Sequence, residues 1–449
     1  MDSDLVRNTA AATGVIVSAL LAAIAHRWTR SALGDDASSR VVPTHVGVGH
    51  YMYTAGVNWL LLSPRTGGMD LALAAPDHKD KKLRKRMARL FGREYTKQSL
   101  LEHIGNISQV AGTRPYRIQG GAADGVSAID VYTGSGLCFT ILPGRGMDIS
   151  HASYKGIPLA WITSAGEVSA HSYEPDGFGW LRTFAGGLLT TCGMSHILDP
   201  STEDGIDYGL HGRASTLIAE DVAASGRWED DEYLISVRGT TREAAFSADQ
   251  FELVRTISTK LGSNYLSLED IVTNIGHRPQ THMYLHHINI GHPLLGPHTE
   301  LQATIRGFRT RPGFEEDAED DFFHFGKPEL DYRPRVFAHN PVADSDGYAY
   351  AGLINESLET GPLAISLRYA IDSFPFFNQW KLLDYGDYIV GLEPNNAGIL
   401  DRPDARRAGD LRVLEAGESV VYRNEIRVLD GLNEINEFRD KVRSVLNEG

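Results

Sequence analysis

Cysteine is scarce in this chain: among 449 residues there are only two, Cys138 and Cys192. So few cysteines exclude a disulfide-stabilised scaffold, and neither lies in a CxxC pair of the kind that binds zinc or carries redox chemistry. Because free cysteines are usually buried in protein interiors, we expect two reduced and buried thiols. This usage fits a cytoplasmic protein.

Positive charge is also in short supply. The 43 Lys and Arg residues are outnumbered by 58 Asp and Glu residues, which gives a net charge of −15. Nucleic acids and anionic membranes both require a basic face, so neither is expected as a main partner. The contents of 42% hydrophobic and 22% charged residues are those of a globular protein with a sizeable core.

Long apolar runs are confined to residues 9–26, an Ala-rich segment that is followed by Arg27 and Arg30. Its length approaches that of a short membrane helix, so any membrane contact is expected here. We treat residues 1–84 as an N-terminal extension and residues 85–449 as one domain. Three interpretations of the extension stay open: a membrane anchor, a loosely packed tail, or a segment that is not made because translation begins at Met87.

Repeats of 20–50 residues and phosphate-loop sequences are missing as well. The Gly-rich stretch 186–193 is not followed by Lys-Ser/Thr, so it does not match a phosphate loop. We interpret its glycines as points where the backbone closely approaches a ligand or another strand. The acidic cluster at residues 314–321 is expected to be an exposed loop.

Short β-prone segments, separated by turns that contain Gly or Asn, make up most of the chain after about residue 90. This pattern, with little helix, predicts an all-β protein: a large antiparallel two-sheet β-sandwich. A short helix over residues 99–107 and a terminal helix over 432–446 are the exceptions. The expected strands include residues 127–133, 136–142, 233–238, 251–258, 265–274, 363–368, 388–392 and 419–429.

The most informative segment is residues 284–293, YLHHINIGHP, which predicts a strand that ends at its Gly-His-Pro. Alternation along a strand puts Leu285, His287 and Asn289 on one face and the residues between them on the other. Two further segments, GLHGR around His211 and GLEPNN around Glu393, supply a second imidazole and a carboxylate. Together the three segments could form a proton-transfer set.

The chemistry of these groups suits acid–base catalysis. Glu393 is followed by Pro394, which we expect to end the strand and leave the carboxylate at the rim of a sheet, where burial can raise its pKa. His287 titrates near neutrality and can serve as the complementary acid. His211 has glycines on both sides, which leaves room for a ligand. The alternative for each is an ordinary structural role.

A metal site is not expected. His286 and His287 are adjacent, so they point to opposite faces of the strand, and only His292 could join His287 at an ion. Arg145, in a Gly-rich turn, could bind sugar hydroxyls or a carboxylate or pair with Asp148. Trp380 could stack on a sugar ring or lie in the core.

In this order along the chain, the motifs RGMD, GGLLTTCG, GLHGR, HxNxGxP, QWK and GLEP resemble a bacterial branch of the aldose 1-epimerase-like, or galactose mutarotase, superfamily. The resemblance covers about residues 90–429. It implies a β-sandwich with the site on a concave sheet, and sugar mutarotation without a metal or organic cofactor.

Carried over by motif, the resemblance implies that Glu393 takes the proton of the anomeric hydroxyl, His287 protonates the ring oxygen and His211 assists on that side. It also implies Arg145, Asp148 and Trp380 as substrate contacts. To these we add Asn289, which shares a strand face with His287, and Arg213. Asn289 lies nearer to the histidine than in the usual pattern, so the sugar is not expected to be simply galactose or glucose. An acidic sugar could be read by Arg145, Arg182 or Arg213.

Two other functions stay open on the sequence alone. The same Glu and His could serve a sugar lyase or another epimerase, and the fold could also be a carbohydrate-binding or sensor module without activity. The identity of the sugar and the oligomeric state are not predicted by any motif.

Overall fold

The computed structural model describes residues 43–45, 51–55, 58–62, 87–311 and 322–448. The chain divides into two compact units, Met1–Leu83 and Arg84–Gly449. In the first, β1 (Pro43–His45), β2 (Tyr51–Ala55) and β3 (Asn58–Leu62) form an antiparallel sheet in that order. The apolar run at residues 9–26 and the acidic cluster at 314–321 lie outside the described residues. Within the described part, no helix has the length and apolarity to cross a membrane.

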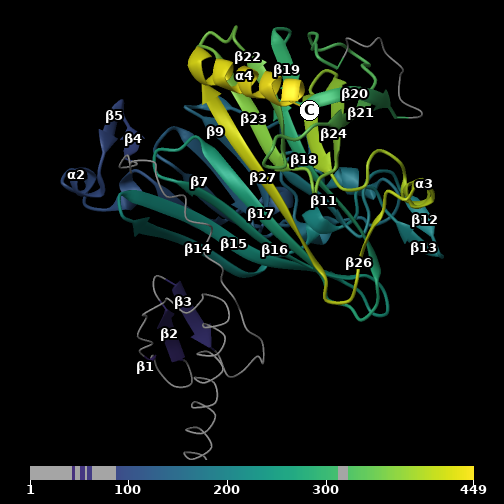
Figure 1. Cartoon of the computed structure of the whole chain (residues 1–449). Coiled ribbons are helices and arrows are strands. Elements are labelled where there is room, and N and C mark those ends of the chain that lie inside the picture. Colours follow the sequence, from purple (N-terminus) through teal and green to yellow (C-terminus); the bar gives the residue numbers. More distant parts are fainter. Residues whose placement is uncertain (1–42, 46–50, 56–57, 63–86, 312–321, 449) are drawn as a thin grey trace, which may run out of the picture. The chain divides into compact units, whose positions relative to one another are not determined.

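The second unit is built mainly from antiparallel strands in three large sheets (Figure 1). The eight-stranded sheet has the order β14 (Glu220–Glu229), β15 (Glu232–Ala244), β16 (Gln250–Lys260), β17 (Tyr265–Asn274), β27 (Ser419–Asp430), β23 (Leu363–Ala370), β22 (Tyr348–Asn355) and β19 (Thr299–Ala303).

The seven-stranded sheet has the order β11 (Thr190–Met194), β18 (Gln280–Gly291), β25 (Tyr388–Asn395), β24 (Phe376–Leu383), β21 (Arg335–Pro341) and β20 (Ile305–Thr310), and β26 (Arg412–Leu414) pairs with β18. The five-stranded sheet has the order β10 (Ile157–Pro158), β9 (Asp148–Tyr154), β8 (Leu137–Leu142), β7 (Ser127–Tyr132) and β6 (Gly112–Arg117).

Small elements complete the unit. Two hairpins are formed by β4 (Ala88–Leu90) with β5 (Arg93–Tyr95) and by β12 (Ser201–Glu203) with β13 (Ile206–Tyr208). The α-helices are α2 (Lys97–Leu101), α3 (Arg402–Ala408) and α4 (Leu432–Glu448). The predicted all-β fold class is confirmed, and all nine predicted strands and the terminal helix are present.

Three expectations differ from the structure. The first helix ends at Leu101, well before residue 107. Strand β25 does not end at Pro394 but continues to Asn395, because the proline nitrogen lies at a gap in the ladder with β18 while the pairing with β24 continues. Cys138 is exposed on β8, so only Cys192 is the buried thiol that we expected.

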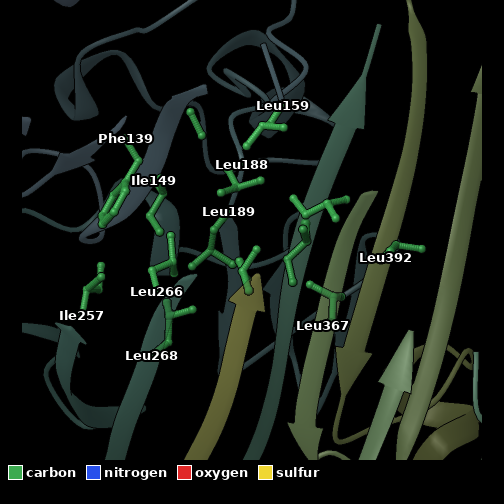
Figure 2. Close-up of a cluster of buried hydrophobic side chains, with 14 of the residues drawn as sticks. Phe139, Ile149, Leu159, Leu188, Leu189, Ile257, Leu266, Leu268, Leu367 and Leu392 are labelled. Carbon is green, nitrogen blue, oxygen red and sulfur yellow. The ribbon is translucent and has the colours of Figure 1, made fainter. Parts of the chain in front are cut away.

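The main core lies between the sheets, where alternating residues of each strand turn inward. Figure 2 shows members from different sheets together: Phe139 and Ile149 from the five-stranded sheet, Leu266 from the eight-stranded sheet and Leu392 from the seven-stranded sheet. Helix α4 covers the opposite face of the eight-stranded sheet, where Phe438 and its neighbours form a separate apolar cluster. Both faces of this part of the sheet are therefore buried.

Strand β18 lies between β11 and β25 and is buried along most of its length. Its residues Tyr284, Ile288 and Ile290 belong to the main core, whereas Met283 and Leu285 belong to a second apolar cluster on the other face. The predicted alternation is therefore present. The second face is the one that carries His287.

Candidate active site

His287 and Glu393 face each other across two neighbouring strands. In the β18–β25 ladder Leu285 pairs with Asn395 and Ile288 with Leu392, and the same register sets His287 opposite Glu393. Nε2 of His287 lies 3.2 Å from Oε1 of Glu393, and both side chains are about 5% exposed. Residues more than a hundred positions apart thus form a close acid–base pair.

Gly391 provides the space for this pair. A β-carbon at position 391 would lie 2.8 Å from Oε1 of Glu393 and 2.9 Å from Cε1 of His287. Both distances are shorter than real side chains tolerate, so a larger residue would push one of the two groups aside. The glycine of the GLEP motif is therefore part of the site's geometry.

His211 approaches from a loop and completes the set that the sequence predicted. Its ring centre is 5.9 Å from that of His287, with the two rings perpendicular. The backbone N–H of Leu198 donates to Nδ1 of His211 at 3.3 Å, which leaves the proton of a neutral imidazole on Nε2. His211 adopts a left-handed conformation, with φ of 57°.

We had expected the glycines beside His211 to make room for a ligand, but they pack against other parts of the chain. Gly209 packs against the carbonyl of Pro175, and Gly212 packs against those of His196 and Gly193. The glycines at 186, 187 and 193 similarly approach backbone carbonyls of neighbouring segments. All of them permit close packing of the chain around the site.

Glu393, His287 and His211 line one cavity of about 480 Å³ together with Trp380. Aromatic rings form much of its wall. The ring centre of His287 lies 5.5 Å from that of Trp380, in an edge-to-face contact, and 5.7 Å from that of Phe184. Trp180 stacks on Phe184 at 4.4 Å. The remaining aromatic members are Trp161 and Phe178. A volume of this size and an apolar lining with a few polar groups are typical of small-molecule sites.

Sequence reasoning missed the charged groups of the cavity. Arg311 follows β20 and its guanidinium lies 2.6 Å from the carboxylate of Asp199; both line the cavity, as does Asp387. None of the three lies in a motif or beside another candidate residue. Only the fold brings these loops to the site, so no local signal in the sequence could have found them.

Burial sets the charge states of the catalytic candidates. Burial raises the pKa of Glu393 to about 8, against a smaller lowering by Arg311. Burial lowers the pKa of His287 to about 4, and it lowers that of His211 well below its usual range, with His287 adding to the effect. Near pH 7 the cavity therefore holds a protonated carboxyl and neutral imidazoles.

Four of the five expected substrate contacts do not line the cavity, and Arg145 and Asp148 are two of them. The guanidinium of Arg145 is buried and donates to the carbonyls of Ser215, Val168 and Thr183. Asp148 accepts from Thr191 and pairs with Arg255. These contacts place both side chains in the supporting structure.

Asn289 is also fully buried, and its amide donates to the carbonyls of Gly187 and His287. Two arginines lie elsewhere: Arg213 is over the ring of Tyr173, and Arg182 pairs with Glu174. Trp380 is the member of the expected substrate-contact set that lies in the cavity.

The opposite face of β18 carries a buried polar network. His286 lies 2.7 Å from Asp270, which also receives two hydrogen bonds from Arg255 and one from Tyr284. Within the described residues, no three His, Cys, Asp or Glu side chains are grouped so that they could hold a metal ion. His286 therefore belongs to the core, and only His287 of the pair faces the cavity.

The strand order and the packed sheets define an antiparallel β-sandwich, and the paired His287 and Glu393 lie in a cavity beside one of its sheets. A candidate aldose 1-epimerase from Klebsiella pneumoniae has the same fold, with a TM-score of 0.71 at 23% identity over 76% of this chain and 91% of its own. The chain belongs to the family described as a domain of unknown function, DUF4432, whose model matches residues 123–428.

More distant structures include a galactose mutarotase-like protein from Clostridium acetobutylicum, with a TM-score of 0.49 and 13% identity over 72% of this chain and 99% of its own. A galactose 1-epimerase from Lactobacillus acidophilus has a TM-score of 0.45 and 13% identity over 72% and 100%. No curated protein sequence matches the chain.

Proposed function

We propose that the protein is a sugar mutarotase, an aldose 1-epimerase that interconverts the anomers of a free pyranose. The observation that carries the proposal is the pair of His287 and Glu393, 3.2 Å apart in an aromatic-walled cavity. Mutarotation needs one group that accepts a proton and one that donates it, and this pair supplies both. The description of the Klebsiella protein is consistent with this chemistry.

The proposed reaction opens and recloses the sugar ring. One member of the pair takes the proton of the anomeric hydroxyl while the other protonates the ring oxygen, and the bond from C1 to that oxygen breaks. Rotation about the C1–C2 bond and reclosure from the other face return both protons. The Nε2–H of His211 is a donor that can hold the ring oxygen during this exchange.

The lining favours a neutral sugar over an acidic one. Among the described residues that line the cavity, Arg311 is the one Lys or Arg, and it already pairs with Asp199, while Asp387 adds a further negative charge. A substrate carboxylate would therefore meet more negative than positive charge. The aromatic walls instead offer apolar surface to the C–H face of a pyranose.

Saturation-transfer NMR on a panel of neutral and acidic sugars tests the proposal directly. We expect the wild-type protein to exchange the α and β signals of at least one neutral sugar. Glu393→Gln and His287→Ala should each reduce this exchange by about 10²–10⁴-fold while the sugar still raises the melting temperature. If the wild-type protein binds sugar without exchanging anomers, it is a binding module and the proposal fails.

A further inference from the structure

Two buried polar atoms beside His287 and Glu393 have no hydrogen-bond partner among the described residues: Nδ1 of His287 and Oδ1 of Asn289. The two side chains come from the same face of β18, two residues apart. The Asn289 side chain also acts on the imidazole as a hydrogen-bonding neighbour that opposes the lowering of its pKa. A buried donor and a buried acceptor that adjoin each other gain by pairing.

The orientation of the Asn289 amide is set by its other contacts. Its Nδ2 donates to the carbonyl of Gly187 at 3.0 Å and to that of His287 at 3.1 Å. Both partners are acceptors, so the NH₂ group must lie on that side and Oδ1 on the other. Oδ1 can only accept, and it therefore suits a His287 that carries its proton on Nδ1.

We propose that Asn289 is a positioning residue that holds the proton of neutral His287 on Nδ1 and leaves Nε2 unprotonated toward Glu393. Glu393 then carries the proton of the pair, so His287 is the base and Glu393 the acid when the ring opens. These roles are the reverse of those that the sequence resemblance implies. The assignment of these two roles rests on the proposed mutarotase function, whereas the position of the proton on His287 does not.

The proton transfers balance under this assignment. Nε2 of His287 takes the proton of the anomeric hydroxyl as the C1 carbonyl forms, and the bond from C1 to the ring oxygen breaks. The Glu393 O–H gives its proton to that oxygen. On reclosure the hydroxyl that formed from the ring oxygen attacks C1 and returns its proton to Glu393. The imidazolium returns its proton to the anomeric oxygen, so the resting state is restored.

His211 provides a contrast within the same cavity. Its Nδ1 accepts from the backbone of Leu198, so its proton lies on Nε2, the reverse of what we assign to His287. One imidazole would thus present a donor to the sugar and the other an acceptor. Each tautomer is specified by the partner of Nδ1: the backbone N–H of Leu198 for His211, and the side-chain carbonyl of Asn289 for His287.

The charged and titratable groups around the pair support the same proton distribution. Arg311, Asp199, Asp387 and His211 share the cavity with it. Burial raises the pKa of Glu393 and lowers that of His287, so in the singly protonated pair the proton resides on Glu393 rather than on His287. A pH–rate profile does not distinguish the two states, because each holds one proton.

The tautomer is therefore measured directly, by long-range ¹H–¹⁵N correlation on the full-length protein labelled with ¹⁵N-histidine. There are 17 histidines, and His287→Gln and His211→Gln identify the two signals by their loss. In the wild-type protein at pH 7 we expect His287 to show a protonated Nδ1 and an unprotonated Nε2. His211 should show the reverse pattern in the same spectrum.

Two variants separate positioning from general support. Asn289→Asp and Asn289→Leu both lose the amide donors to Gly187 and His287, but only the leucine also loses the acceptor. We expect Asn289→Leu to abolish the preference for the Nδ1–H tautomer and to slow anomer exchange by about 10–100-fold. Asn289→Asp should keep the tautomer even where the melting temperature falls.

The outcomes distinguish this inference from the proposed function. A protonated Nε2 on wild-type His287, or an unchanged tautomer in Asn289→Leu, overturns the inference even if the protein exchanges anomers. If the protein shows the expected tautomer but exchanges no sugar anomers, the role of Asn289 in holding the imidazole is supported. The assignment of His287 as base and Glu393 as acid is then overturned.

Discussion

Gly391 lies directly beneath the imidazole of His287, where a β-carbon would come within 2.9 Å of Cε1. The strand therefore has no side chain at the position where one would collide with the imidazole of His287. The same β-carbon would come within 2.8 Å of Oε1 of Glu393, so a side chain at position 391 would disturb both members of the pair.

Gly391→Ala should reduce anomer exchange by about 100-fold, because a displacement of about 1 Å in an acid–base pair costs that much. The strand should still form, since alanine is accepted in β-structure at modest cost. Exchange rates by saturation-transfer NMR, with circular dichroism for the fold, measure both effects. Gly105→Ala is the matched control, because open space surrounds that position. Equal activity of the two variants would contradict the tight fit.

The rate of exchange should follow a bell-shaped pH profile. Activity requires one proton on the pair, so kcat/KM should fall below about pH 4, the pKa of His287, and above about pH 8, that of Glu393. Because Arg311 lowers the pKa of Glu393, Arg311→Met should move the alkaline limb to higher pH. Arg182→Met removes an exposed cation outside the cavity and should leave the limb in place.

The burial of Glu393 should also make the folded state less stable at alkaline pH. Its pKa is raised from 4.5 to about 8, so the folded protein retains a proton that the unfolded chain has lost. The stabilisation is complete below about pH 4.5 and is lost as the pH rises toward 8, at up to about 1.4 kcal/mol per pH unit.

Urea unfolding of the wild-type protein and Glu393→Gln between pH 5 and 9 measures this effect. The glutamine does not titrate, so the difference between the two isolates Glu393. We expect the wild-type protein to lose stability relative to the variant by a few kcal/mol across this range. A constant difference would show that Glu393 is ionised and solvated in the folded protein.

The buried network behind the site should be important for stability. Arg255 is fully buried and makes two hydrogen bonds to Asp270, at 2.8 and 2.7 Å. Asp270→Ala should lower the free energy of unfolding by about 3–5 kcal/mol, because it leaves a buried guanidinium short of its main counter-charge.

The preceding residue on the same strand is the natural control. Glu269 pairs with Arg423 at 3.0 Å, but both side chains are about half exposed. Glu269→Ala should therefore change the free energy of unfolding by less than about 1 kcal/mol. Chemical denaturation of the two variants gives the comparison, and similar losses would contradict the importance of the buried pair.

The fold class could be predicted from the sequence because strand signals are local. Alternation along residues 284–293 assigned His286 and His287 to opposite faces correctly, since the period of two is a property of the backbone itself. The three segments with His211, His287 and Glu393 do meet in one cavity, as their motifs led us to expect.

Other parts of the site depended on contacts between distant residues. Arg145 has the chemistry of a sugar contact, but three backbone carbonyls from two loops take up its guanidinium. Arg311 carries no local signal and yet lines the cavity. For a long polar side chain the sequence specifies only which donor and acceptor groups it carries. The partners of those groups are decided by the fold.

The sequence alone thus determined the strands, their inward and outward faces and the groups available for proton transfer, because these follow from neighbouring residues. Only the tertiary structure decided which of those groups share the cavity and which charge states burial gives them. Desolvation and hydrogen-bond partners depend on every segment that packs nearby, and the pKa values of Glu393 and His287 are set by that surrounding protein.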